Sequence, residues 1–132
     1  MRKQTFMSFP WLSQYPEKVL PVIDVAPHQN LVALLDESLL RYAGMPALTS
    51  VGRSTSYAEL KLLSERFASW LQHIGVGRGD RVAIMMPNLA PFAVAVLGAL
   101  RVGAVVVTVN PLYTPRELEF QLRDSDAKAI VI

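Results

Sequence analysis

The chain has no cysteine among its 132 residues, and this absence excludes two kinds of protein. Without thiols it can form neither a disulfide-stapled scaffold nor a thiolate metal site. The lack of cysteine also suits a reducing compartment, so we expect a cytoplasmic protein.

Charged residues are also scarce, at 18% of the chain against about 25% in ordinary soluble domains. The net charge is only +2, and the densest basic cluster is Arg78 with Arg81, with an aspartate between them. Such a sequence predicts no nucleic-acid partner. Hydrophobic residues reach 52%, although a chain this short exposes much surface and should be relatively polar. We therefore expect another segment of protein to cover part of it.

Long uninterrupted apolar runs are missing too. The opening stretch, MRKQTFMSFPWLS, lacks the apolar core of a secretory signal. Residues 89–109 would be long enough to cross a bilayer, but Pro91, Arg101 and Gly103 interrupt them. An arginine in the hydrocarbon costs roughly 2.5–3.5 kcal/mol, so we predict no membrane span.

Local catalytic motifs are absent as well. Gly75, Gly77 and Gly79 follow a predicted helix and precede a strand, the reverse of a phosphate loop, so we interpret them as a helix stop and a turn. Neither His28 nor His73 has a partner at metal-ligand spacing, and no serine lies in a nucleophile elbow. The residues predict no catalytic side chain and no metal ligand in this chain.

The first half of the chain divides into an arm, a helix and a hairpin. Residues 1–29 hold four of the nine prolines and show no period, which indicates an arm lying across something larger. Asn30 is suited to cap a helix over 31–43, which Gly44 would end. Two short strands around Gly52–Arg53 indicate a hairpin.

A second helix, from 57 to 74, begins at the capping-box pair Ser56 and Glu59. Its apolar side chains recur at helical spacing and predict a buried stripe. The stripe contains Leu60, Leu63, Phe67, Trp70, Leu71 and Ile74.

From residue 81 the pattern is strand, helix, strand, helix, strand. The strands are 81–86, 104–109 and 127–132; the helices are 89–101, capped by Asn88, and 115–124, capped by Thr114 with Glu117. Apolar runs without alternation are typical of strands covered on both faces. The order predicts an α/β fold with a parallel sheet and crossover helices. Since a third parallel strand is normally followed by a covering helix, we expect the sheet to be incomplete.

The stretch NPLYTPREL, at 110–118, follows the second of these strands. Its Asn-Pro forces a turn at the carboxyl end of the strand, where open parallel sheets place ligand loops. A plain turn before a capped helix explains the same residues, so the pattern leaves both interpretations open.

Four stretches resemble the adenylate-forming enzymes, in order and spacing. They are RSTSYAEL, GVGRGDRVAIMMPN, LGALRVGAVVVTVNPLYTPREL and QLRDSDAKAIVI. MMPN and NPLYTPREL are most similar to the bacterial long-chain fatty-acid–CoA ligases, and WLSQYPEKV is similar to their N-terminal arm. The resemblance implies an N-terminal arm at 1–29, followed at 30–132 by the incomplete start of the large AMP-binding N-terminal domain.

For the whole enzyme the resemblance implies ATP, CoA and Mg²⁺, a fatty acid as substrate, and peripheral contact with the membrane. The phosphate loop, the acidic residue for the ribose and the adenylation lysine of the family are absent from these residues. We therefore expect this chain to be inactive alone, with the remainder of its own domain as its partner.

The resemblance also singles out Arg101, which ends a predicted helix. In several acyl-CoA-forming relatives a basic residue there approaches the nucleotide part of CoA, and arginine grips phosphate well. The alternative is that Arg101 only complements the helix C-terminus. For function, two alternatives stay open: another adenylate-forming branch, such as an aryl-CoA ligase or an adenylation domain, and a non-catalytic α/β binding module.

Overall fold

The computed structural model describes residues 10–20 and 30–132. A short 3-10 helix, η1 (Pro10–Gln14), falls within the predicted arm. The other arm residues, 1–9 and 21–29, lie outside the described residues, as does His28. The packing of the arm therefore stays a prediction.

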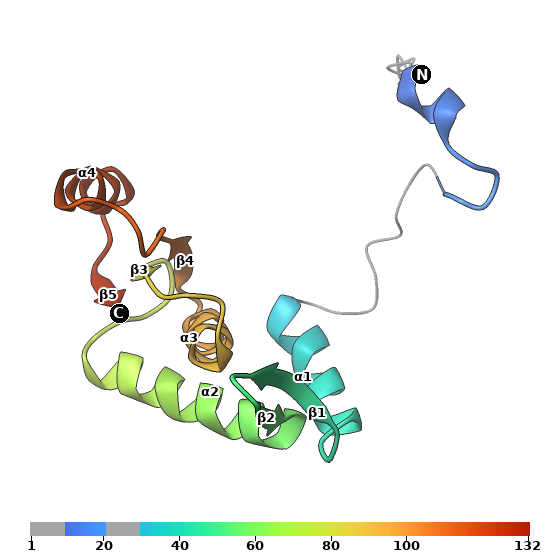
Figure 1. Ribbon diagram of the computed structural model, residues 1–132, viewed down its shortest axis with the longest axis horizontal. Coiled ribbons are helices and arrows are strands. Elements are labelled where there is room, and N and C mark those ends of the chain that lie inside the picture. The colour runs from blue at the N-terminus through green and yellow to red at the C-terminus, as the bar shows by residue number, and fades with distance from the viewer. Residues whose placement is uncertain (1–9, 21–29) are drawn as a thin grey trace, which may run out of the picture.

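Three parallel strands form the main sheet, in the order β4–β3–β5 (Figure 1). The strands are β3 (Arg81–Ile84), β4 (Val105–Thr108) and β5 (Ala129–Val131), joined by helices α3 (Ala90–Arg101) and α4 (Pro115–Ser125). Val82 of the central strand pairs with Val106 on one side and Ala129 on the other. The predicted α/β fold, a parallel sheet with crossover helices, is confirmed.

The two crossover helices lie on opposite faces of the sheet. Figure 1 shows α3 and α2 (Tyr57–His73) on one side and α4 on the other. The chain moves in one direction from β3 to β4 and in the reverse direction from β4 to β5, so two right-handed crossovers must use different faces.

The core lies between β3, α3 and α2. Val82 and Ile84 of β3 are fully buried in this core, and so is Leu71 of α2. Burying a side chain such as Ile84 or Leu71 stabilises the fold by about 1.5–3 kcal/mol. The rest of this core is made of Ala68, Val76, Ala95, Ala99, Val102 and Ala104. Small residues dominate on α3 because this helix packs closely against both the sheet and α2.

Strand β4 is less covered than its apolar sequence predicts. Among the described strands its one neighbour is β3, so it lies at an edge of the sheet, and Val105 remains 49% exposed. The prediction that this strand is covered on both faces is therefore wrong for Val105 in the described part of the chain. An apolar run does not distinguish an edge strand from a central one.

The buried face of α2 differs from the predicted stripe. Its buried residues are Leu60, Ser64, Ala68 and Leu71. Trp70 is 49% exposed and Ile74 is 44% exposed, so placing them in the core was wrong. The Trp70 ring instead stacks on Phe67, with 5.5 Å between the ring centroids. The Phe67 ring packs against Gly98 of α3, and the half-exposed Trp70 ring lies farther out.

The predicted hairpin is present, with its turn one residue earlier than expected. Strands β1 (Pro46–Ser50) and β2 (Arg53–Ser56) pair antiparallel around Val51 and Gly52, whose φ angles are 50° and 74°. Two positive φ angles fit the twist of a two-residue hairpin loop. The first helix, α1 (Leu31–Arg41), is also shorter than predicted: Tyr42, not Gly44, follows its last residue as the C-cap.

Most predicted helix caps are confirmed, with one exception. The Asn30 side chain accepts a hydrogen bond from the Ala33 amide at 2.9 Å, and Thr114 forms a full capping box with Glu117. Asn88, however, does not cap α3. The N-cap is Leu89, which makes no side-chain bond, so that prediction was wrong. Proline in the first turn of α3 removes one amide that would otherwise need a cap.

Ser56 supplies half of its predicted capping box. Its hydroxyl accepts from the Glu59 amide at 3.1 Å, while the described contacts include no return bond from the Glu59 carboxylate.

None of the helices in the described part of the chain has the length and apolar character needed to span a membrane. The stretch 89–109 divides into α3 and β4.

Candidate functional site

Strands β3 and β4 end side by side, and this line of carboxyl ends is the edge of the sheet at which open α/β folds bind ligands. Val109 donates its amide to the Ile84 carbonyl at 3.0 Å, which holds the two strand ends side by side. The chain then turns at Asn110, whose side-chain oxygen accepts from the Leu112 amide at 3.0 Å. The predicted turn is confirmed, and its position at the sheet edge is fixed by hydrogen bonds within the loop.

Helix α4 is anchored to the same edge. The Gln121 amide nitrogen donates to the Thr108 carbonyl at 3.0 Å, while its amide oxygen is buried without a hydrogen-bond partner among the described residues. At the start of the helix, hydrogen bonds from the hydroxyl and amide of Thr114 hold the pKa of Glu117 below its ordinary value. Glu117 is therefore ionised at neutral pH and committed to the cap.

An open groove of about 670 Å³ lies along α4. It is lined by Tyr113, Thr114, Arg116, Glu117, Phe120, Gln121 and Asp124. Phe120 is 72% exposed, and the groove therefore combines an aromatic ring with charges of both signs. It contains no paired nucleophile and base.

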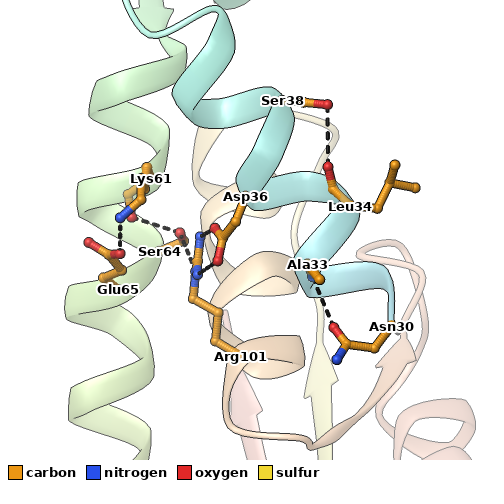
Figure 2. A network of polar contacts seen from close by, with 9 residues as sticks. All are labelled: Asn30, Ala33, Leu34, Asp36, Ser38, Lys61, Ser64, Glu65 and Arg101. Carbon is orange, nitrogen blue, oxygen red and sulfur yellow. Dashed lines mark hydrogen bonds and ion pairs between the residues drawn. The ribbon is translucent and has the colours of Figure 1, made fainter. Parts of the chain in front are cut away.

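Arg101 lies at the junction of three helices, as Figure 2 shows. Its Nη1 donates to Asp36 of α1 at 3.0 Å, its Nη2 donates to the other oxygen of the same carboxylate, and its Nε donates to the Ser64 hydroxyl of α2 at 3.0 Å. The Arg101 side chain is only 12% exposed. The guanidinium thus ties α3 to α1 and α2.

The surroundings of Asp36 favour its ionised form, which is the partner of Arg101. Hydrogen bonds from Arg101, and then the positive charges of Arg101 and Lys61, hold the pKa of Asp36 below its ordinary value. Ser64 is fully buried, and its hydroxyl donates a hydrogen bond to the Lys61 carbonyl oxygen at 2.8 Å. Three guanidinium nitrogens are therefore engaged within the chain. Sequence reasoning missed this contact because Asp36 lies 65 positions away in the sequence.

Arg78 lies near the same helix end. Its side chain packs over Gly103, where an added Cβ would lie 3.2 Å from the Arg78 Cγ. Arg78 and Arg101 both line a groove of about 610 Å³ beside the start of α1. The structure thus brings together two arginines that the sequence places in different motifs.

The three-glycine loop forms the predicted helix stop and turn. Gly75 and Gly79 have φ angles of 84° and 85°. The Gly77 amide donates to the Asp80 carboxylate at 2.8 Å, and Lys128 donates to the same oxygen at 2.8 Å. The amide is therefore used inside the protein. The loop joins α2 to the beginning of β3, at the opposite end of that strand from the candidate ligand edge.

The described residues offer no cluster of three histidine, aspartate or glutamate side chains that could hold a metal ion. His73 is the last residue of α2. The candidate site consists of the carboxyl ends of β3 and β4, the turn at Asn110 and the capped start of α4.

Comparison with known proteins identifies the kind of domain to which this edge belongs. The family described as AMP-binding enzyme matches residues 35–132. The long-chain-fatty-acid–CoA ligase of Escherichia coli O6:H1 is 50% identical over 123 residues, which cover 92% of this chain and 22% of that protein. The 4-coumarate–CoA ligase 3 of Arabidopsis thaliana is 40% identical over 114 residues, covering 85% of this chain and 20% of that protein.

A solved structure shows the same arrangement of elements. The benzoate CoA ligase from Burkholderia xenovorans LB400 superposes with a TM-score of 0.74 at 36% identity, covering 78% of this chain and 21% of that one. The chain therefore spans about a fifth of the length of the proteins it matches.

Proposed function

Since the chain belongs to the family of AMP-binding enzymes, we propose that it forms part of the N-terminal domain of a long-chain fatty-acid–CoA ligase. The observation that carries this proposal is the 50% identity to the Escherichia coli ligase over 92% of the chain. Similarity to the 4-coumarate and benzoate ligases is lower, at 40% and 36%. The fatty-acid branch is therefore preferred to the aryl branch.

The proposed reaction has two steps. A fatty-acid carboxylate is a poor electrophile, because its charge repels nucleophiles and oxide is a poor leaving group. The carboxylate therefore attacks the α-phosphorus of ATP, which releases diphosphate and leaves an acyl-adenylate. The thiolate of CoA then attacks the acyl carbon, forming the thioester and releasing AMP.

The residues of this chain fit a supporting role in that reaction. The described residues gather no ligand set for Mg²⁺, and we assign no step to a metal held by this chain. The chain supplies the turn at Asn110, at the carboxyl end of β4, and the anchored helix α4. In the proposed enzyme they position the loop between β4 and α4 next to the substrates of the larger domain. We propose that the 132 residues alone are inactive.

The contact of Arg101 with a CoA phosphate is a separate proposal, supported by the resemblance. The structure adds a condition: the guanidinium already holds Asp36 and Ser64, so a phosphate must compete with the Asp36 carboxylate for the same donors. An Arg101 that keeps Asp36 throughout the reaction has a purely structural role.

The test is to read the gene beyond codon 132 and to assay the protein it encodes. We expect a continuing frame with a phosphate loop, and a product that forms acyl-CoA from ATP, CoA and a long-chain fatty acid. A preference for 4-coumarate or benzoate would assign the aryl branch. A stop codon with a stable, soluble product would favour the non-catalytic binding module.

Two further assays complete the test. Acyl-CoA formation that requires only the 132 residues, and that is lost on a change within them, would contradict the proposed inactivity. Cell fractionation checks the predicted cytoplasmic location and peripheral membrane contact.

A further inference from the structure

The groove of about 610 Å³ beside the start of α1 is lined by two arginines, Arg78 and Arg101, and none of its described lining residues is acidic. Leu31, Val32 and Leu100 add apolar surface to its wall. A hollow with two cations and no carboxylate favours an anionic ligand. The planar fork of an arginine matches the oxygens of a phosphate group in particular.

The two arginines differ in what they can offer a ligand. Arg101 is nearly buried, and three of its nitrogens already donate to Asp36 and Ser64. Arg78 is exposed, and within residues 10–20 and 30–132 its guanidinium has no hydrogen-bond or ion-pair partner. Because binding an anion through Arg101 requires an existing bond to break, Arg78 is the more available cation of the groove.

The stem of the Arg78 side chain is held in place by packing. It lies over Gly103, where an added Cβ would be 3.2 Å from the Arg78 Cγ and 3.3 Å from its Cβ. The backbone below is fixed as well, since the Gly79 amide donates to the Gly103 carbonyl at 2.9 Å. A stem that is already ordered loses less side-chain entropy when the guanidinium binds a ligand.

The groove lies at the amino ends of the strands. Arg78 precedes β3 and Gly103 precedes β4, whereas the candidate ligand edge is formed by the carboxyl ends of the same strands. Each strand has four residues, which separates its two ends by about 13 Å. A ligand group in the groove is therefore bound away from the edge at which we place the reaction. The apolar surface beside the arginines suits a phosphate that is carried by a larger organic group.

We propose that Arg78 makes this groove a binding site for a phosphate monoester, while Arg101 stays paired with Asp36 and forms the wall behind it. In the proposed reaction CoA carries such a phosphate, on its ribose and far from its thiol. Naming CoA as the source rests on the proposed function, whereas the phosphate site itself rests on the groove.

The experiment is a calorimetric titration of the protein that the complete gene encodes, and its readout does not require ligase activity. It compares CoA with dephospho-CoA, which lacks only the ribose phosphate. Arg78→Gln removes the free cation of the groove. Arg53→Gln is the matched control, because Arg53 is an exposed arginine at the start of β2.

Arg78→Gln should weaken the binding of CoA roughly tenfold, as expected for the loss of one charge-assisted hydrogen bond, and leave the binding of dephospho-CoA unchanged. Arg53→Gln should change neither affinity. An unchanged affinity of Arg78→Gln for CoA would overturn the proposal. Equal losses for CoA and dephospho-CoA would also overturn it, because they would show a general disturbance of the loop instead of a lost phosphate contact.

Two smaller probes distinguish the sources of the phosphate. We expect adenosine 3′,5′-bisphosphate to bind more tightly than inorganic phosphate and to lose affinity in Arg78→Gln. Inorganic phosphate that binds as tightly, and with the same dependence on Arg78, would assign the groove to the free ion, against the proposal. Arg78-dependent binding of the bisphosphate by a protein that forms no acyl-CoA would reject the proposed function and leave the phosphate site standing.

Discussion

Arg101 and Asp36 form a two-pronged ion pair that joins the end of α3 to the middle of α1, with the arginine nearly buried and the carboxylate one-third exposed. The pair replaces the hydration of the buried guanidinium, and Ser64 satisfies a third guanidinium nitrogen. Removing Asp36 should therefore cost more stability than removing Arg101. The arginine left behind is buried away from water, whereas the aspartate left behind can still be hydrated.

We predict that Asp36→Ala lowers the free energy of unfolding by about 1.5–3 kcal/mol, the range for a hydrogen bond to a charged group. The cost arises because Arg101 stays buried without its counterion. Urea denaturation measures it. Glu119→Ala is the control, because its pair with Arg123 is exposed, and it should cost below about 0.5 kcal/mol. Equal losses for the two variants would contradict the structural role of the Asp36 pair.

The same pair predicts a dependence of stability on pH. Since the pKa of Asp36 is depressed in the folded state, its contribution is present above the unfolded pKa and is lost as pH falls through the folded one. The difference in unfolding free energy between the parent chain and Asp36→Asn should be constant above about pH 5 and shrink below about pH 4. A difference that grows on acidification would contradict this assignment.

Close packing of α2 on α3 makes Gly98 sensitive to any side chain. A Cβ there would lie 2.6 Å from the Phe67 ring and 3.0 Å from the Ser64 carbonyl oxygen. We expect Gly98→Ala to destabilise the fold by roughly 1–2 kcal/mol, because overpacking outweighs the better helix propensity of alanine. Gly44→Ala, which meets open space, should stay within about 0.5 kcal/mol of the parent. A stabilising Gly98→Ala in thermal unfolding would show that the helices separate at little cost.

Two asparagines that both precede helices should behave differently. Asn30→Ala removes the side-chain acceptor of the Ala33 amide and should cost about 1 kcal/mol. Asn88→Ala should be close to neutral, because Leu89 is the N-cap of α3. Chemical denaturation of the two variants checks the pair, and a larger loss at Asn88 would reverse the assignment of the caps.

In the full-length enzyme, Arg101→Ala tests the proposed contact with CoA. If the contact exists, KM for CoA should rise by roughly 10- to 150-fold, the equivalent of 1.5–3 kcal/mol, while adenylate formation changes little. Asp36→Ala is the matched variant, since it loosens the same junction and keeps the cation. Equal effects of both variants on KM for CoA, or no effect of either, would leave Arg101 with its structural role alone.

Local sequence patterns determined the parallel sheet, with each strand end predicted to within two residues. Capping by Asn30 and Thr114, the glycine stop after α2 and the apolar runs of β3 and β5 all act over a few residues, so they can be identified without knowing the fold. The turn at Asn110 belongs to the same class. The family resemblance also rests on such short stretches, and the match over residues 35–132 confirms it.

Only the tertiary structure decided which side chains meet across helices. Asp36 and Arg101 show no local relationship, and their contact exists because α1 and α3 pack together. The exposure of Trp70 and Val105 has the same origin. Apolar residues can lie on more than one face of a helix, and an apolar strand can lie either at the centre or at the edge of a sheet. Short-range hydrogen bonds and periodicity are written into neighbouring residues, whereas burial and ion pairing depend on which distant surfaces pack against one another.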